Sequence, residues 1–395
     1  MSKKLFISGN DAVAEGVRLA KPHVIAAYPI TPQTVVVERL AEMVEDKSLA
    51  SEFLHVESEH SALSACMGSG ALGARTFTAT SSQGLLYLSE CLHYASGGRF
   101  PIVMMNANRS LALPWSIYGD HRDSLSQLDC GWIQIYVEDA QESLDMAIQS
   151  FAIAEHLSVL TPVMLNLDGF ALTHTYELVE IPEQKEVDAW LPPFRTPYAM
   201  DFDKPKNMGF SSQPSDNTEF KYQQHRAISD AKEIIKEIDS SFGNTFGRTY
   251  GGLVDAYLCG DAEFIIIALG SVAGTCRTVI DELRKEGRKA GLLKIRFMRP
   301  FPDEEIITIT RNAKAIAVID KDISFGYEGT VFTNVNSALS RYPNHILKLN
   351  FIAGLGGRDI PKESIREIFD KLNDGINNNS VKTVEFLNLN VETDD

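Results

Sequence analysis

The chain of 395 residues lacks several features that mark common functional classes. No apolar run approaches the ~20 residues that a membrane-spanning helix needs. The first residues turn polar at Asn10 before a signal-peptide core could form, so we expect a cytoplasmic protein. Basic residues are scarce: 37 lysines and arginines face 53 acids, for a net charge of −16. That balance disfavours binding to nucleic acid or to an anionic membrane.

Motifs for bound metals and nicotinamides are also lacking. The few cysteines are far apart, without the Cys-x-x-Cys spacing of zinc sites and iron–sulfur clusters, and we interpret them as buried free thiols: Cys66, Cys91, Cys130, Cys259 and Cys276. The segment 120–123, Asp-His-Arg-Asp, has too few ligands for a usual metal site, which favours a salt-linked loop. The segment 270–274, Gly-Ser-Val-Ala-Gly, lacks the third glycine of a dinucleotide site.

What the first half does contain is a regular alternation of apolar, strand-length runs with helical periodicity. This pattern predicts an α/β domain over residues 1–191, with a parallel sheet covered by helices on both faces. The expected strands are 24–28, 53–56, 76–80, 101–105, 133–137 and 162–167. The expected helices are 11–20, 32–44, 58–73, 85–96 and 140–156.

The second half begins with a change of composition. Residues 192–250 are polar and proline-rich, which indicates a connector, and helix-forming residues at 230–239 predict a surface helix within it. A second, smaller α/β domain is expected over 251–372, with strands 264–269, 291–296, 315–319 and 347–352 and helices 272–286 and 303–311. The polar, asparagine-containing segment 373–395 is predicted to be a loosely packed tail.

Four polar motifs follow predicted strands of the first domain, at the points where the chain turns into a helix or loop. Because the carboxyl ends of parallel strands share one edge of a sheet, we expect these motifs to form one composite site. They are Tyr28-Pro29-Ile30-Thr31-Pro32, Val56-Glu57-Ser58-Glu59-His60, Thr80-Ser81-Ser82-Gln83-Gly84 and Asn106-Ala107-Asn108-Arg109.

Each motif also has a purely structural interpretation. Thr31 and Pro32 suit the cap and first position of a helix, and Glu59 complements the positive end of a helix. Ser82 either caps a plain turn or belongs to a platform whose backbone donors face a ligand. Arg109 suits a bidentate grip on a carboxylate, with an ion pair to a nearby acid as the alternative.

Taken in order, the four motifs resemble those of the α subunit of 2-oxoacid:ferredoxin oxidoreductases. The likeness continues through the segments 119–123, 129–132, 167–170, 296–302 and 320–322, and so covers nearly the whole chain. The resemblance implies a pyrimidine-binding domain of the thiamine-enzyme type, followed by a domain similar to the transketolase C-terminal domain. The second domain is expected to do no direct cofactor chemistry.

The resemblance also implies roles for individual residues. Glu59 matches the glutamate that hydrogen-bonds N1′ of thiamine diphosphate and promotes the imino tautomer; an apolar pocket would favour its neutral, donating form. His60 is expected to be a neighbour, and not the base. Thr31 and Arg109 match positions that contact the 2-oxoacid, through a hydroxyl group and a guanidinium group. Tyr28 and Ser82 are further candidates for cofactor binding.

The chain has no Gly-Asp-Gly motif with a downstream asparagine in a suitable context, the usual grip on magnesium and diphosphate. The resemblance therefore implies a β-type partner that carries the diphosphate site, Mg²⁺ and at least one [4Fe–4S] cluster, together with a γ- or δ-type subunit. Ferredoxins are commonly acidic, so we expect ferredoxin to dock on a partner and not on this acidic chain. The chain is not expected to be active alone.

The substrate is the least determined feature. Pyruvate enzymes of this type often have Asn-Arg-Ala-Leu-Ser-Ala-Pro where this chain has Asn-Arg-Ser-Leu-Ala-Leu-Pro at 108–114. On the resemblance we expect oxalate, which yields only CO2, in preference to pyruvate, which yields acetyl-CoA and CO2. A noncatalytic assembly subunit is a third alternative, which the joint presence of Thr31, Glu59 and Arg109 disfavours.

Overall fold

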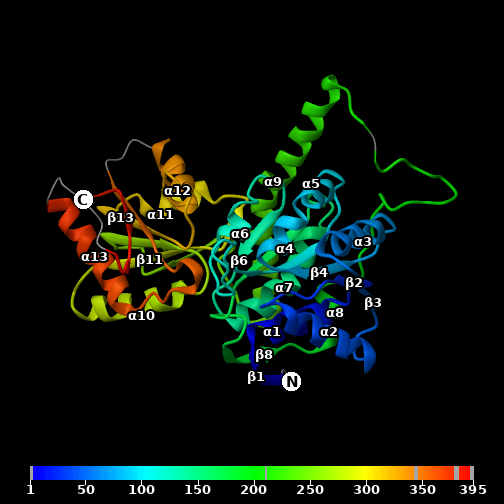
Figure 1. Ribbon diagram of the computed structural model, residues 1–395, viewed down its shortest axis with the longest axis horizontal. Helices are drawn as coiled ribbons and strands as arrows, with labels where there is room; N and C mark the ends of the chain where they lie inside the picture. Colours follow the sequence, from blue (N-terminus) through cyan, green and yellow to red (C-terminus); the bar gives the residue numbers. More distant parts are fainter. Residues whose placement is uncertain (1–2, 210, 342–345, 378–381, 392–395) are drawn as a thin grey trace.

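The computed structural model describes residues 3–209, 211–341, 346–377 and 382–391. These form two α/β domains that lie side by side, the first on the right of the view and the second on the left (Figure 1). The first domain is built on a seven-stranded sheet and the second on a six-stranded sheet. No helix in the described residues is long and apolar enough to cross a membrane.

The seven-stranded sheet has the strand order β12-β6-β7-β5-β4-β2-β3. Six strands are parallel and confirm the six predicted from the sequence: β2 (Val24–Ala27), β3 (Glu52–His55), β4 (Thr76–Thr80), β5 (Val103–Asn108), β6 (Ile133–Tyr136) and β7 (Val163–Asp168). The seventh strand, β12 (Phe297–Arg299), comes from the second half of the chain and pairs antiparallel with β6. The four polar motifs therefore follow the carboxyl ends of neighbouring parallel strands.

The central strands of this sheet are buried on both faces, as expected for parallel strands with continuous apolar runs, whereas the edge strand β3 is mostly exposed. Successive residues of β5 show this, because Val103 and Met105 belong to one core cluster and Met104 to another. One face packs on α1 (Gly9–Ala20), α2 (Thr34–Glu45) and α7 (Ala140–Glu155), and the other on α3 (Glu59–Ala71), α4 (Ser82–Tyr87) and α5 (Ser89–Gly97). The single helix expected over 85–96 is wrong: the chain leaves helical geometry at Leu88, which separates α4 from α5.

Several short elements were not expected from the sequence. β1 (Lys3–Ser8) and β8 (Tyr176–Ile181) form a separate antiparallel pair. α6 (Arg122–Leu125) and α8 (Gln184–Trp190) are short helices of the first domain. β1 and β8 are only partly buried, and Phe6 and Leu178 are both exposed. Their sequences therefore lack the clear apolar run that predicts a strand.

The six-stranded sheet has the order β15-β14-β13-β10-β11-β9 and carries helices on both faces. Its strands are β9 (Val254–Tyr257), β10 (Phe264–Ala268), β11 (Ala290–Ile295), β13 (Ala315–Asp320), β14 (Leu347–Ile352) and β15 (Val384–Phe386). α10 (Val272–Lys285) and α13 (Lys362–Asn377) cover one face, and α11 (Asp303–Thr310) and α12 (Thr330–Ser340) the other. A short 3₁₀ helix, η1 (Leu355–Gly357), precedes α13.

The prediction of a loosely packed tail over 373–395 is wrong for its described part. α13 continues to Asn377, and β15 adds to the sheet in parallel with β14. Leu387, just after β15, is buried in the core cluster under α13. Residues 378–381 and 392–395 of this segment lie outside the described residues.

The helix in the expected connector is much longer than predicted. α9 runs over 33 residues, Pro214–Phe246, with proline at its first turn and Gly247 at a φ of +74° after its end. Only its second half has a regular buried stripe: Ala227, Ala231, Ile235, Asp239 and Phe242. The first half is polar and projects away from the body of the protein (Figure 1), so hydrophobic periodicity could not reveal it.

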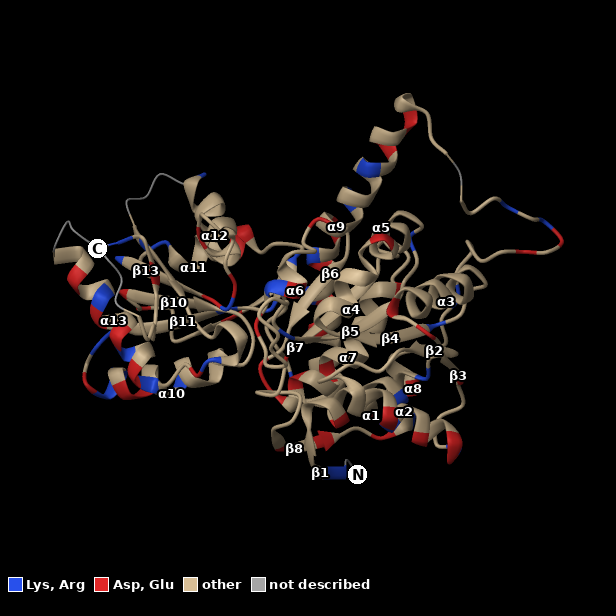
Figure 2. Cartoon of the chain, viewed as in Figure 1, with Lys and Arg blue, Asp and Glu red and all other residues tan. Residues whose placement is uncertain are grey.

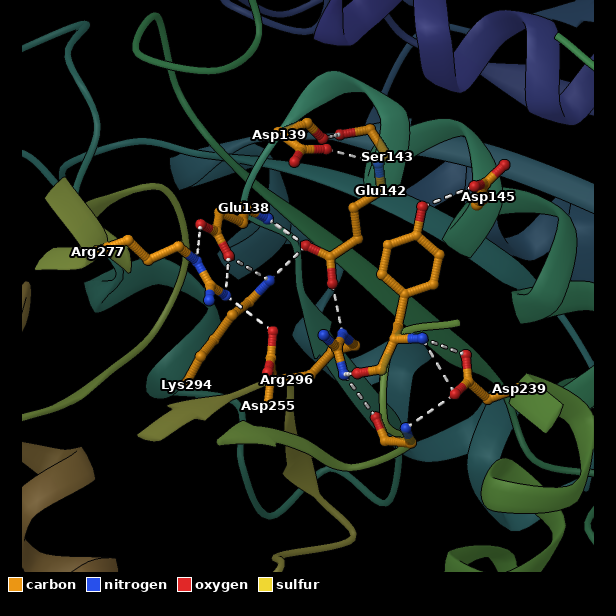
Figure 3. A network of polar contacts seen from close by, with 12 residues as sticks. Glu138, Asp139, Glu142, Ser143, Asp145, Asp239, Asp255, Arg277, Lys294 and Arg296 are labelled. Carbon is orange, nitrogen blue, oxygen red and sulfur yellow. Dashed lines mark hydrogen bonds and ion pairs between the residues drawn. The ribbon is translucent and has the colours of Figure 1, made fainter. Parts of the chain in front are cut away.

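A buried ionic network joins the two domains (Figure 3). Glu142 of α7 accepts hydrogen bonds from Lys294 in β11 and from Arg296, and all three side chains are almost fully buried. Burial would raise the pKa of Glu142, but the two cations hold it at about 2. Because one core cluster also continues from the first sheet into the second, the domains form one packed unit.

Candidate active site

The four motifs meet at the carboxyl edge of the seven-stranded sheet, as their order in the sequence predicted. Arg109, after β5, donates from Nη1 to the carbonyl oxygen of Thr31, after β2, over 2.7 Å. Its Nη2 lies 3.5 Å from Oε1 of Gln83, after β4. The β3 motif joins through Glu59, whose carboxyl group lies against Gly84. One site is therefore assembled from four separate parts of the sequence.

Glu59 lies in the first turn of α3, which Ser58 caps by accepting a hydrogen bond from the backbone of Ser61 over 3.1 Å. Its side chain is not directed to solvent, since the residue is only 7% exposed. A Cβ atom at Gly84 would lie 2.5 Å from Oε1 of Glu59 and 2.7 Å from Oγ1 of Thr80. Only glycine at this position leaves the carboxyl group its place beside α4.

Arg109 is 8% exposed as a whole residue, and the protein satisfies its guanidinium group only in part. Burial lowers its pKa, while the charge of Asp123 acts in the opposite direction. Its Nε atom is buried and has no hydrogen-bond partner within the described residues. The protein therefore leaves Nε without an acceptor and gives Nη2 only the long contact with Gln83, because the strong contact to Thr31 uses Nη1.

Asp123 is the residue at this edge whose importance the sequence did not reveal. Its fully buried carboxylate accepts hydrogen bonds from five neutral N–H groups, over 2.7 to 3.3 Å: the backbones of Ser82, Arg109 and Ser124 and the side chains of Asn106 and Asn108. Burial is the stronger effect and raises its pKa to about 6. Asp123 therefore ties the β4 motif to the β5 motif.

Ser82 serves this edge through its backbone more than through its hydroxyl group. Its φ is +51°, a left-handed conformation that non-glycine residues rarely adopt, and its N–H donates to Asp123 over 3.1 Å. Its Oγ atom lies 2.7 Å from the carbonyl oxygen of Ser110 and 2.6 Å from Oε1 of Gln83. The hydroxyl group thus already has acceptors inside the protein.

Tyr28 and His60 lie at the exposed margin of the edge. Tyr28 is 38% exposed, and its carbonyl oxygen accepts from Nε2 of the buried Gln33 over 2.9 Å. His60 lies on the outer side of α3, with Nε2 3.8 Å from a carboxyl oxygen of Glu90. Gln33 was not singled out from the sequence, although its buried Oε1 has no hydrogen-bond partner among the described residues.

The segments 120–123 and 270–274, for which the sequence indicated neither a metal site nor a dinucleotide site, make structural contacts. Asp120 and Arg122 form the expected ion pair over 2.8 Å, while His121 lies 2.7 Å from Asp168. Asp168 also accepts from Lys321 over 2.7 Å and from the backbone and hydroxyl groups of Ser271. Burial alone would raise the pKa of Asp168, but Lys321 and His121 hold it well below its usual value. This second buried carboxylate joins the domains next to the site.

The described residues contain no group of three or more histidine, cysteine or acidic side chains that could hold a metal ion. All five cysteines are buried and free, as predicted. Burial raises the pKa of Cys66, Cys130 and Cys259 to about 12 and also raises that of Cys276, so these thiols are poor ligands at neutral pH.

Comparison with known proteins first shows the general class of protein to which the chain is similar. Residues 15–240 match the family described as pyruvate flavodoxin/ferredoxin oxidoreductase, thiamine diphosphate-binding, and residues 262–365 match pyruvate:ferredoxin oxidoreductase core domain II. The fold is similar to a chain of 2-oxoglutarate:ferredoxin oxidoreductase from Magnetococcus marinus, with a TM-score of 0.73 at 19% identity, covering 94% of this chain and 65% of that one. It is also similar to a split-gene transketolase, with a TM-score of 0.54 at 11% identity over 94% of this chain and 99% of that one.

Closer relatives define the family within that class. The chain is 48% identical to pyruvate synthase subunit PorA of Methanothermobacter thermautotrophicus, over 92% of this chain and 93% of the relative. It is 44% identical to ketoisovalerate oxidoreductase subunit VorA of Pyrococcus furiosus, over 93% of each. The chain belongs to the α subunits of 2-oxoacid:ferredoxin oxidoreductases and carries their thiamine diphosphate-binding domain. It is one subunit of a multisubunit enzyme.

The residues at the carboxyl edge fit the part of thiamine diphosphate that this family's α subunit would hold. A buried carboxyl group suits a hydrogen bond to a ring nitrogen, and Gly84 lets the carboxyl group of Glu59 lie directly against α4. Buried polar atoms without partners among the described residues, Oγ1 of Thr80 and Oε1 of Gln33, suit a polar ring that lies nearby.

Proposed function

We propose that the chain is the α subunit of a pyruvate:ferredoxin oxidoreductase, in which Glu59 activates thiamine diphosphate. The observation that carries this proposal is the buried Glu59 carboxyl group, held beside Gly84 at the same sheet edge as Arg109. The choice of pyruvate is supported by the 48% identity to pyruvate synthase subunits from two methanogens. We therefore replace oxalate, expected from the sequence, with pyruvate as the substrate.

When bound, thiamine diphosphate supplies the carbon nucleophile for the 2-oxo group and takes up the electron pair released as CO2 leaves. Glu59 would hold a proton at the hydrogen bond to the pyrimidine ring, so that the ring's exocyclic nitrogen can act as a base. Its burial against α4 excludes water from that hydrogen bond. Gly84 would position Glu59, because any side chain there collides with the carboxyl group.

Arg109 would bind the carboxylate of the 2-oxoacid through the Nε and Nη2 edge. Its Nη1 is held by the carbonyl oxygen of Thr31, which fixes the direction of the fork. The hydroxyl group of Thr31 would contact the oxoacid, as the residue is exposed at the edge. Tyr28 and the backbone of Ser82 would line the cofactor side of the same edge.

The remaining chemistry belongs to partner subunits in this proposal. A β-type subunit would carry the diphosphate, Mg²⁺ and at least one [4Fe–4S] cluster, and a γ- or δ-type subunit would complete the electron path to ferredoxin. The two electrons would leave one at a time, and coenzyme A would take the acetyl group.

The test is viologen reduction by the purified complex with pyruvate, 2-oxoisovalerate, 2-oxoglutarate and oxalate, each with and without coenzyme A. We expect the highest kcat/KM with pyruvate, and dependence on coenzyme A. A preference for 2-oxoisovalerate is the second candidate, favoured by the 44% identity to VorA. Turnover of oxalate without coenzyme A would contradict the choice of pyruvate, and absence of turnover with all four would contradict the proposed function.

The same assay with Arg109→Ala tests whether this chain contacts the substrate. Loss of the guanidinium group should raise KM for pyruvate at least about tenfold, since a charge-assisted bidentate contact is lost. KM for the viologen should stay unchanged. Equal effects on both constants would assign Arg109 to the structure of the edge.

A further inference from the structure

A cavity lies away from the candidate active site, near the amino ends of the parallel strands of the seven-stranded sheet. β12 runs antiparallel to β6, so the chain leaving β12 at Arg299 moves toward the amino end of β6 and away from the edge that holds Glu59. There α9, the β12–α11 corner and α12 enclose a cavity of about 370 Å³. Its lining comes from both halves of the chain.

The charged residues that line this cavity are mostly cations, in a chain whose net charge is −16. Three cations line it, Lys232, Arg299 and Arg341, against one acid, Asp303. Asp303 accepts from Nζ of Lys232 over 2.5 Å and from Nη1 of Arg341 over 3.1 Å. Elsewhere on the chain, both signs of charge are scattered over the two domains (Figure 2).

Arg299 is the one of these three cations that forms no ion pair with Asp303. Its Nη1 donates to the carbonyl oxygen of Met298 over 2.7 Å and to Oδ1 of Asn334 over 3.2 Å. Within the described ranges no carboxylate lies in ion-pair distance of it, and burial lowers its pKa, while the charge of Asp129 acts in the opposite direction. A partly buried guanidinium group without an ion-pair partner is costly unless an anion arrives to pair with it.

The uncharged lining of this cavity is mixed: His225, Ser229, Asn334 and Ser337 are polar, and the remaining residues form an apolar part. Ile228 of α9, Pro300 and Phe301 of the corner, and Ala338 of α12 contribute to it. A simple clamp between α9 and the second domain would explain the ion pairs of Asp303, but not an unpaired Arg299 beside an apolar surface. The combination fits a ligand with an anionic end and a flat, weakly polar end.

We propose that this cavity binds an organic phosphate of nucleotide size, with the phosphates on Arg299, Lys232 and Arg341 and the ring system on Phe301 and Ile228. Arg299 and Arg341 can each offer a fork of N–H groups to phosphate oxygens. The site is separate from the thiamine edge, so a bound nucleotide would act as an effector and not as a reactant.

The test is isothermal titration of the purified complex, loaded with thiamine diphosphate and Mg²⁺, with ADP and with inorganic pyrophosphate as probes. We expect one ADP per α chain, bound at least about tenfold more tightly than pyrophosphate because only ADP uses the apolar surface. Arg299→Gln and Arg341→Glu should each weaken ADP binding at least about tenfold. Arg341 has a 67% exposed side chain, so Arg341→Glu is the variant that least disturbs folding.

The matched control is Arg366→Gln on α13, a half-buried arginine with two acidic partners outside this cavity. It should bind ADP as the wild type does. Absence of ADP binding, binding that both cavity variants leave unchanged, or equal affinity for ADP and pyrophosphate would overturn the proposal. Viologen reduction without ADP should be the same in wild type and Arg341→Glu, which separates this site from the proposed catalytic function.

Discussion

Asp123 and Glu142 are both fully buried carboxylates of the first domain, but the protein satisfies them in opposite ways. Asp123, at the active-site edge, accepts only from neutral N–H groups, and burial raises its pKa to about 6. Glu142, at the domain interface, accepts from Lys294 and Arg296, which hold its pKa at about 2 despite burial. One carboxylate is therefore held by dipoles and the other by charges.

The difference shows how the two regions are used. At the interface Lys294 is ion-paired with Glu142 and Glu138, and Arg296 with Glu142, and in the described part of the chain neither cation has a buried side-chain donor without a partner. At the edge Asp123 holds Arg109 only by its backbone N–H, so the guanidinium group keeps unsatisfied donors. A site that must bind an anion is thus held in place by neutral N–H donors, and the positive charge of Arg109 is not used in an ion pair among the residues that the structure describes.

The largest effect on stability is expected from Glu142→Gln. The substitution leaves Lys294 and Arg296 buried with too little negative charge, which should lower the free energy of unfolding by about 3–5 kcal/mol. Urea denaturation of the purified complex measures it. Glu282→Gln, which breaks exposed ion pairs on α10, is the matched control and should change little. Similar midpoints for the two variants would contradict the role given to Glu142.

Asp123→Asn should have a smaller effect on stability but a strong one on turnover. An amide group places an NH2 where two or three N–H groups now point at an oxygen, which costs about 1–3 kcal/mol. Because those groups belong to Ser82 and Arg109, the motifs after β4 and β5 should shift and kcat/KM for pyruvate should fall. Full activity in this variant would show that Asp123 does not position the edge.

The pH dependence of the free energy of unfolding should have opposite signs for Asp123 and Glu142. The pKa of Asp123 rises on folding from 3.8 to about 6, so its ionisation removes stability as pH increases across that window. The pKa of Glu142 falls on folding from 4.5 to about 2, so its contribution is present above pH 4.5 and is lost as pH decreases toward about 2. The stability of each Asn or Gln variant relative to wild type, measured by urea denaturation against pH, should therefore change in opposite directions. Parallel pH profiles would remove the distinction.

The sequence predicted the parallel strands of the first domain well, because strands buried on both faces have continuous apolar runs. It could not predict that Phe297–Arg299 would join the first sheet, since only packing of the second domain brings β12 beside β6. The first half of α9 was missed for a related reason: a helix that projects into solvent has no apolar stripe.

The candidate site shows the same limit. The four motifs were singled out because strand ends converge, and the family resemblance then pointed to Glu59, Thr31 and Arg109 within them. The structure brings these three residues to one edge. Asp123 was grouped with a salt-linked loop, because sequence spacing does not show which acid faces cations and which faces amides. The one signal was the pair Asn106 and Asn108, two amides on an otherwise apolar buried strand.

The smallest change to the structure that should still break the site is Gly84→Ala. The added Cβ would lie 2.5 Å from Oε1 of Glu59, so the carboxyl group must move while the fold remains. Turnover should fall at least about tenfold, since small displacements of catalytic groups cost large factors. Gly68→Ala in α3 is the matched control, because a Cβ there meets nothing within 4 Å. Equal activity of the two variants would show that Gly84 does not position Glu59 for catalysis.

The most direct measurement is the rate at which the purified complex exchanges the C2 proton of bound thiamine diphosphate, compared between wild type and Glu59→Gln. The amide of the variant cannot pass a proton to the ring as a carboxyl group does, so we expect exchange and pyruvate turnover to fall together by about 10²-fold or more. Assembly and thiamine diphosphate binding should be retained. Exchange at the wild-type rate in Glu59→Gln would contradict the assignment of Glu59 and, with it, the account of this edge.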